Sequence, residues 1–408
     1  MPDKKQSGCG CSSIPISVIL LFLGGCYWWF IHLGNLNKIV SYATSFLPNN
    51  QPATIPVIKE APSTYEPIAK LPQAPIVTST NSPQAPTPIS TPTNIPQAPV
   101  STPTTKPQAP LAQTPWDKKA IRGIYLSRYQ VTNNADEQTI RERVRYYRAQ
   151  GINTLIHGVW GNGCTMYNSE VLQQTLGFKS CPNQFQDKWL DWMIDEAHKQ
   201  GMQVHAYFEK GIKIDKNSPI YDMAVSKKWL VPGVDKTYAG IDHYVLDVEV
   251  PEVANLFKKI SVEFVQKYSN IDAVQWDDYL GYHAELPGQV DRTAHLTKFV
   301  QEMIADIKKA NPKVSFDICH HNPYWAKRYF AADLLAWKVD RIFIQAYNDA
   351  NFKEELNYAQ NYTGVAITDY QFSRLKELID NNKIKSILVF PFSGKPEETA
   401  AKVKRIIK

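Results

Sequence analysis

Motifs of several common enzyme classes are missing from this chain. No Gly-x-Ser-x-Gly is present, which argues against a serine hydrolase, and no Gly-x-Gly-x-x-Gly follows the first predicted strand, which argues against a dinucleotide-binding fold. His320 and His321 are adjacent, so on a strand they face opposite sides, and no His-x-His or His-x-x-x-His completes a metal site. Cys319 is interpreted as a buried apolar thiol rather than a nucleophile. We expect neither a metal nor a cofactor.

A strong excess of one charge is missing too. The 45 basic residues exceed the 39 acidic ones by 6, which is a modest surplus for 408 residues, and they form no basic stripe. Proteins that bind nucleic acid concentrate Lys and Arg on one face or along one helix. We therefore expect no nucleic-acid partner.

One long apolar run, Ile14–Leu33, lies near the N-terminus. About 20 apolar residues are enough to cross a lipid bilayer as a helix. Lys4 and Lys5 precede the run and no comparable basic cluster follows it, which favours a cytoplasmic N-terminus. We predict a cytoplasmic segment at 1–13, an anchor in the cytoplasmic membrane at 14–34, and a periplasmic or other extracytoplasmic remainder.

Two alternatives to an uncleaved anchor remain open. A cleaved signal peptide would have a shorter apolar core and a small-residue cleavage site. A lipoprotein signal would use Leu23-Gly-Gly-Cys26, but the apolar stretch Tyr27–Ile31 continues past that cysteine, which a lipoprotein does not need. The uncleaved anchor is favoured, with Trp28 and Trp29 in the aromatic belt of the membrane interface.

Residues 35–115 form a linker by composition. Seventeen of the 28 prolines lie between Pro48 and Pro115, and Pro-Gln-Ala-Pro recurs four times. The repeat carries no apolar set to bury, so it predicts an extended, disordered tether rather than a packed domain.

Residues 116–408 suit one α/β domain. Extended apolar stretches alternate with helical ones eight times, which favours a closed (β/α)₈ TIM barrel over an open sheet. The predicted strands are 121–127, 154–160, 203–209, 271–276, 314–320, 341–347, 364–369 and 386–392. The predicted helices are 137–150, 187–200, 251–267, 292–310, 324–337 and 396 to the end.

Six pieces of this domain, in order, resemble the glycosyl-hydrolase-like 10 family of bacterial envelope proteins. They are Arg122-Gly-Ile-Tyr, Gly151-Ile-Asn-Thr with Val159-Trp-Gly-Asn-Gly, the stretch Glu196–Phe208, Val245-Leu-Asp-Val-Glu-Val-Pro-Glu-Val, Asp272-Ala-Val-Gln-Trp-Asp-Asp-Tyr and Gln345-Ala-Tyr. The resemblance implies a barrel glycosidase, and some relatives act on the glycan strands of peptidoglycan. The chain departs from the family pattern at Trp276 and Leu280, at Asp247-Val-Glu, and in a shorter stretch after the sixth strand.

Glycoside hydrolysis generally uses two carboxyl groups on either side of the bond. Asp277 and Asp278 end the fourth predicted strand, where this fold places its chemistry. Asp278 is the predicted general acid, and Asp277 orients or supports it, because neighbouring side chains on a strand point apart. Glu209 is preferred as the second carboxylate. Asp247 and Asp369 are the alternatives for that role, and a salt bridge of Glu209 with Lys210 or Arg128 is the competing interpretation.

Residues at or near the other strand ends could bind a sugar. Aromatic faces stack on sugar rings, although packing in the core explains such residues equally well. A buried amide such as Gln345 must have a partner. The predicted substrate-binding set is Trp160, Tyr207, Asp247, Tyr279, His320, Gln345 and Tyr347.

Cys164 and Cys181 lie in the loop after the second predicted strand. In an oxidising compartment we expect them to form a disulfide.

The leading hypothesis is a membrane-tethered glycosidase of envelope glycan, and the alternative is a non-catalytic glycan-binding or structural envelope module. The sequence specifies neither the sugar nor the oligomeric state.

Overall fold

The computed structural model of the protein describes residues 113–236, 241–287 and 291–408. The predicted cytoplasmic segment, the predicted anchor, and the predicted linker up to residue 112 lie outside the described residues. Within the described ranges, no helix has the length and apolar character that crossing a membrane requires.

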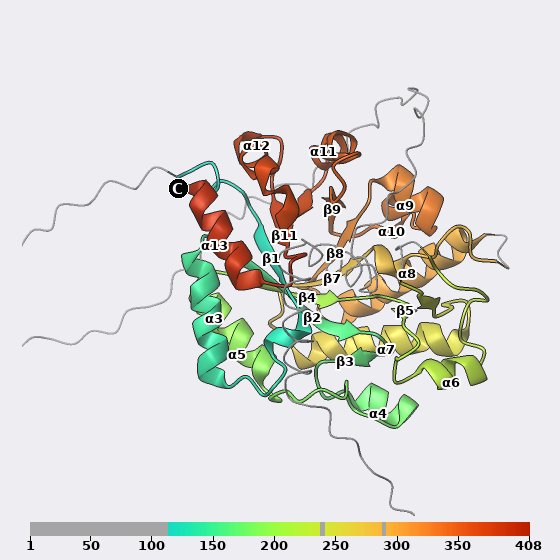
Figure 1. Ribbon diagram of the computed structural model, residues 1–408. Coiled ribbons are helices and arrows are strands. Elements are labelled where there is room, and N and C mark those ends of the chain that lie inside the picture. The colour runs from blue at the N-terminus through green and yellow to red at the C-terminus, as the bar shows by residue number, and fades with distance from the viewer. Residues whose placement is uncertain (1–112, 237–240, 288–290) are drawn as a thin grey trace, which may run out of the picture. The chain divides into compact units, whose positions relative to one another are not determined.

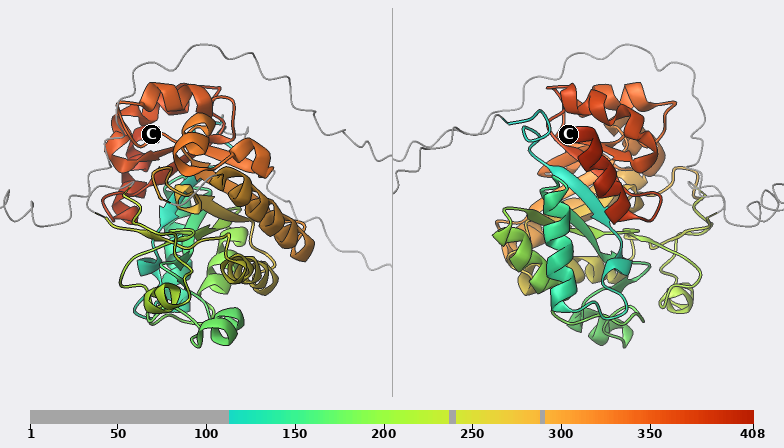
Figure 2. Two further views of the ribbon diagram at one scale, coloured as in Figure 1. Left: turned by 90° about the vertical axis from the view of Figure 1, so that its right-hand side faces the viewer. Right: turned by 60° about the vertical axis from the view of Figure 1, so that its left-hand side comes forward.

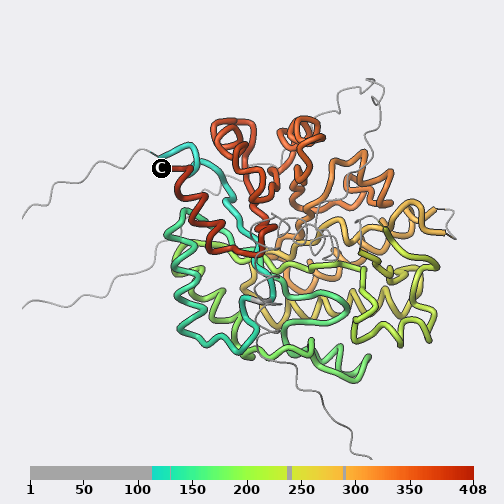
Figure 3. Tube along the Cα trace, in the orientation of Figure 1, coloured from blue at the N-terminus to red at the C-terminus, as the bar shows by residue number. Residues whose placement is uncertain are grey.

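A closed ring of parallel strands organises these residues (Figure 1). Eight strands pair side by side, and the pairing of β1 with β2 closes the ring. The barrel strands are β1 (Arg122–Leu126), β2 (Thr154–Gly161), β4 (Gln203–Phe208), β7 (Ala273–Asp277), β8 (Ser315–His320), β9 (Arg341–Gln345), β10 (Gly364–Thr368) and β11 (Ile387–Phe390). Each overlaps one predicted strand, so the predicted (β/α)₈ barrel is confirmed. The last strand, β11, pairs in parallel with the first, β1, and Figure 3 traces the path of the chain between them by colour.

Side chains of the barrel strands alternate between two apolar cores. Tyr125, Ile156 and Phe343 belong to a small core inside the ring. Val274 and Ile318 belong to a larger core between the strands and the helices. Because successive side chains point to opposite faces, this alternation decides which residues at a strand end face the barrel interior.

Helices cover the outside of the ring, as the two further views in Figure 2 show. Five predicted helices are found close to their expected bounds: α3 (Glu137–Ala149), α5 (Trp189–Lys199), α7 (Pro251–Lys267), α8 (Arg292–Ala310) and α13 (Pro396–Ile407). Local chemistry explains where they begin. Asp136 caps α3 by accepting the backbone N–H of Thr139 at 2.8 Å, and Pro251 occupies the first turn of α7, where no donor is needed.

The single helix predicted over 324–337 is wrong. The structure has two helices there, α9 (Pro323–Phe330) and α10 (Leu334–Trp337). Ala331 ends the first in a left-handed conformation with φ of 55°, and the Asp333 side chain caps the second by accepting from the N–H of Ala336. A left-handed residue stops a helix, so the chain turns between the two.

Several short elements were not predicted. They are α4 (Glu170–Leu176), α6 (Tyr221–Ser226), α11 (Phe352–Ala359), α12 (Leu375–Asp380), the short strand β3 (Cys164–Thr165), and an antiparallel pair, β5 (Lys213–Ile214) with β6 (Tyr244–Val245). The last pair lies in the long excursion between β4 and α7.

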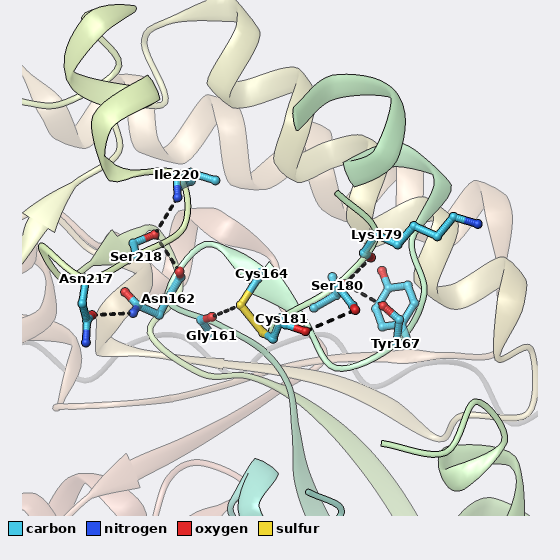
Figure 4. The surroundings of a disulfide bond; sticks show 11 residues. Gly161, Asn162, Cys164, Tyr167, Lys179, Ser180, Cys181, Asn217, Ser218 and Ile220 are labelled. Carbon is cyan, nitrogen blue, oxygen red and sulfur yellow. Dashed lines mark hydrogen bonds between the residues drawn. A yellow bond between two sulfur atoms is a disulfide. The ribbon is translucent and has the colours of Figure 1, made fainter. Parts of the chain in front are cut away.

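The predicted disulfide is confirmed: Cys164 is bonded to Cys181 (Figure 4). Cys164 lies on β3, and the backbone N–H of Cys181 donates to the carbonyl of Thr165 at 2.8 Å. The bond therefore ties β3 to the segment that follows α4.

Candidate active site

Two carboxyl groups face the barrel interior where β4 and β7 end. Tyr207 of β4 belongs to the interior core, so Glu209, two residues on, faces the same side. Trp276 of β7 packs outward against Phe257 of α7, so its neighbour Asp277 faces inward. Since β4 and β7 are paired neighbours, Glu209 and Asp277 lie near each other, and the charge of Glu209 raises the pKa of Asp277.

Asp277 is buried, with 4% of its surface exposed, and its carboxyl group accepts two hydrogen bonds. Its Oδ1 accepts the backbone N–H of Tyr279 at 3.0 Å, and its Oδ2 accepts the hydroxyl of Tyr207. Burial raises the pKa of Asp277 to about 7; the two hydrogen bonds oppose this rise, as does the charge of Lys213. A carboxyl group that keeps its proton near neutral pH can act as a general acid.

Two glycines of β2 make room for Glu209. A Cβ at Gly158 would lie 3.2 Å from Oε2 of Glu209, and one at Gly161 would lie 3.6 Å from a guanidinium nitrogen of Arg128. Burial raises the pKa of Glu209, while the charges of Arg128 and Lys210 oppose that rise. Both cations act on Glu209 through their charge, and Lys210 itself forms an ion pair with Asp215. The carboxyl group of Glu209 lies beside Asp277.

Asp278 is directed toward β8 and β9. The chain leaves β7 after Asp277, and Asp278 begins the short 3₁₀ helix η2 (Asp278–Leu280). Its Oδ1 accepts from Nε2 of Gln345 at 3.1 Å, and the same nitrogen donates to the carbonyl of Cys319 at 3.0 Å. The partner expected for a buried Gln345 amide is thus present. The two adjacent Asp residues have separate partners, and Asp277 is the one bonded to Tyr207.

A buried lysine that the sequence analysis did not single out lies nearby. Lys213 of β5 is fully buried, and its Nζ lies 2.7 Å from Oδ2 of Asp235. The same atom lies 5.1 Å from the ring centre of Tyr279 and 5.5 Å from that of Phe330. The carboxylate and the two ring faces stabilise its charge. Its only sequence signal is a lysine between two isoleucines, which also fits an exposed edge strand.

His320 and His321 differ in their surroundings. His320 is fully buried at the end of β8, and within the described ranges neither ring nitrogen has a hydrogen-bond partner. Burial lowers its pKa well below the ordinary value, so the ring is neutral. The pKa of His321 is raised. Burial lowers it, but the hydrogen bond and the charge of Glu355, whose Oε1 lies 3.6 Å from Nδ1 of His321, outweigh the effect of burial. No group of three or more His, Cys, Asp or Glu among the described residues could hold a metal.

The remaining predicted residues divide into two groups. Tyr279 and Tyr347 are half-buried beside the two Asp residues, and after burial the charges of Asp277 and Asp278 are among the causes that raise the pKa of each tyrosine. With Tyr207 and Gln345 they form one cluster around the carboxyl groups.

Trp160, Asp247 and Asp369 are committed to other contacts. Trp160 is buried against Phe257 of the helix layer, and its indole N–H donates to the carbonyl of Gly211 at 2.9 Å. Asp247 accepts the hydroxyl of Tyr282 at 3.0 Å. Asp369 accepts hydrogen bonds from the hydroxyl of Thr399, at 3.1 Å, and from the hydroxyl of Ser393. None of these contacts involves the carboxyl pair.

Residues 120–293 match the Glycosyl hydrolase-like 10 family. The resemblance predicted from the sequence is confirmed over this range, which holds Glu209, Asp277 and Asp278 and ends at the start of α8. Gln345 and Tyr347 lie beyond the matched residues.

A curated relative is similar over nearly the same length. Glycosyl hydrolase DigH of Escherichia coli K12 is 31% identical over 163 residues, which make up 37% of this chain and 36% of DigH. DigH of Shigella flexneri matches with the same values. The chain therefore spans about a third of the length of these relatives.

Solved structures match more distantly. The α-galactosidase AgaA of Geobacillus stearothermophilus, a GH36 enzyme, is 15% identical, with a TM-score of 0.44 over 73% of this chain and 42% of AgaA. A glycoside hydrolase family 20 β-N-acetylglucosaminidase is 9% identical, with a TM-score of 0.43 over 70% of each chain.

Proposed function

We propose that this chain is a glycoside hydrolase in which Asp277 is the general acid and Glu209 is the second carboxyl group. The observation that carries the proposal is the pair itself: two inward-facing carboxyl groups at neighbouring strand ends, one with a pKa raised to about 7. Active sites of this fold form at the carboxyl ends of the strands. The match to the Glycosyl hydrolase-like 10 family supports the reaction class.

Burial raises the pKa of both groups, and hydrogen bonds or cations beside each of them oppose the rise. Asp277 holds its proton in a buried position and delivers it to the glycosidic oxygen as the bond to the sugar breaks. Glu209 has Arg128 and Lys210 beside it, and these cations favour its ionised form, which acts on the sugar or on the attacking water. Asp278, held by Gln345, positions the end of β7. This assignment exchanges the roles predicted for Asp277 and Asp278.

The proposed substrate is the glycan strand of peptidoglycan or a related envelope polysaccharide. The family resemblance supports this class, and the predicted anchor and tether would hold the barrel outside the cytoplasmic membrane. The Cys164–Cys181 disulfide agrees with an oxidising compartment, because disulfides persist there and are rare in the cytosol.

The test is product analysis with the full-length protein. Peptidoglycan glycan strands, intact or stripped of stem peptides, are incubated with the wild type and with isosteric variants, and new reducing ends are identified by mass spectrometry. We expect Asp277→Asn and Glu209→Gln each to lower kcat/KM by roughly 10²–10⁴-fold, and Asp278→Asn to cost less. Equal activity of Asp277→Asn and wild type would contradict the assignment of the acid. Absence of any product from the wild type would refute the hydrolase.

A further inference from the structure

Two aromatic rings that the proposed chemistry does not use stand at the carboxyl end of the barrel. Tyr370 lies in the 3₁₀ helix η3 (Asp369–Arg374), directly after β10, and it is 68% exposed. Its ring centre lies 5.3 Å from that of Phe392, a partly exposed residue that follows β11. Both segments leave the same end of the barrel at which Asp277 leaves β7.

A hydrogen-bonded brace holds the segments that carry these rings. Asp369, the residue before Tyr370, accepts both the hydroxyl and, at 3.4 Å, the backbone N–H of Ser393, the residue after Phe392. Its Oδ2 also accepts Thr399 of α13 at 3.1 Å. These hydrogen bonds hold the backbone segments of both rings in place, although the Tyr370 ring is largely exposed. A preorganised aromatic surface loses little entropy when it binds a ligand.

A row of aromatic ring contacts leads from the candidate active site to Phe390 at the end of β11. Tyr207, which is bonded to Asp277, lies 5.2 Å from Tyr125, and Tyr125 lies 5.5 Å from Phe390. Phe390 is two residues before Phe392, and both are partly exposed. Tyr207 and Tyr125 are buried inside the ring, so this row places Phe390, and with it the segment that carries Phe392, at the same end of the barrel as Asp277.

The spacing indicates what the surface could bind. β7 and β10 are three pairings apart in the sheet order, which corresponds to about 14 Å at roughly 4.8 Å for each pairing. This is longer than one monosaccharide, so a ligand that reaches both places must be an oligosaccharide. A pyranose ring presents a face of C–H groups, which gains from contact with an exposed aromatic ring.

We propose that Tyr370 and Phe392 form a distal sugar subsite, on which one ring of a glycan strand stacks while a bond further along the strand lies between Asp277 and Glu209. The subsite rests on the proposed hydrolase function and specifies its substrate as an extended strand. Cleavage of long strands is then favoured over cleavage of short ones.

The experiment compares kcat/KM of the full-length protein on long and short fractions of peptidoglycan glycan strands that have been stripped of stem peptides. The wild type is expected to prefer the long fraction. Tyr370→Ala and Phe392→Ala should each lower the long-to-short ratio by roughly 3- to 10-fold. Tyr370→Phe keeps the ring and should keep the ratio. Leu335→Ala removes another exposed apolar side chain, on α10, and serves as the matched control.

The outcomes distinguish a failure of the sugar subsite from a failure of the proposed hydrolase function. A wild-type ratio near one, or an unchanged ratio in both alanine variants, overturns the subsite and leaves the hydrolase in place. If the wild type cleaves no strand, the hydrolase proposal fails, and calorimetric binding of the long fraction decides the subsite. Weaker binding by Tyr370→Ala than by wild type supports it, and equal binding overturns it.

Discussion

Replacing Asp277 with asparagine should raise stability at neutral pH while lowering kcat/KM by roughly 10²–10⁴-fold. The folded protein keeps the proton on Asp277 up to a pH of about 7, whereas the carboxyl group of an unfolded aspartate ionises near 3.8. Between these values the folded state binds one more proton than the unfolded state. The free energy of unfolding of the wild type therefore falls as the pH rises through this window, whereas asparagine has no proton to lose.

The magnitude follows from the pKa. A rise from 3.8 to about 7 corresponds to about 4 kcal/mol, at about 1.36 kcal/mol for each pH unit. This is an upper value, because the folded state relaxes around an ionised carboxylate. We expect the stability of Asp277→Asn minus that of wild type to be constant below pH about 4, to grow between pH about 4 and 7, and to level off about 2–4 kcal/mol higher.

Chemical denaturation of both proteins from pH 3.5 to 8.5 measures this difference. Asp136→Asn is a control of opposite sign, because the hydrogen bonds at the start of α3 lower the pKa of Asp136. The stability that Asp136 contributes is present above the unfolded pKa and is lost as the pH falls. A pH-independent difference for Asp277→Asn would refute a raised pKa at Asp277 and with it the assignment of the general acid.

Three further predictions concern the surroundings of the carboxyl pair and the disulfide. Tyr207→Phe removes a hydrogen bond that lowers the pKa of Asp277, so the basic limb of the kcat/KM–pH profile should move to higher pH. Gly158→Ala places a Cβ 3.2 Å from the carboxylate of Glu209, so kcat/KM should fall by on the order of tenfold or more while the melting temperature changes little. Reduction of the disulfide should lower the free energy of unfolding by roughly 3 kcal/mol in chemical denaturation.

Each of these has a specific contrary outcome. If the basic limb of the Tyr207→Phe profile is unchanged or moves to lower pH, ionisation of Asp277 does not set that limb. Gly177→Ala is the matched control for Gly158→Ala. Gly177 has φ of 84°, and an added Cβ there would meet nothing within 4 Å, so this variant should lose stability and keep activity. A large loss of stability in Gly158→Ala would show that this substitution acts through folding rather than through Glu209. Equal denaturation midpoints for oxidised and reduced protein would show that the disulfide adds no stability.

The eight strands could be predicted because each is a short apolar stretch bounded by turn residues or by a helix. Strand β11, Ile387–Phe390, is a run of four apolar residues, and the first three are buried. Short helices such as α4 and α11 were missed because fewer than nine residues give little periodic signal. The break between α9 and α10 was missed because the left-handed residue there is an alanine, which usually favours a helix.

The candidate site could be predicted only as a neighbourhood. Both Asp residues were identified at the end of a strand, and Glu209 was identified at the end of the adjacent one. Which Asp faces inward depends on which residues of β7 face the helix layer, and a shift of one position exchanges the two. Lys213 could not be found at all, because its burial depends on Asp235 and Phe330, which are distant in the chain.

The amino-acid sequence alone determined the class of fold, the disulfide partners and the place along the chain where carboxyl chemistry is concentrated. These follow from local patterns, because strand alternation and residue type are properties of neighbouring residues. Only the tertiary structure decided that Asp277 rather than Asp278 lies beside Glu209, and that burial raises the pKa of Asp277 to about 7. Desolvation and side-chain direction depend on groups brought together from separate strands, and no local pattern contains them.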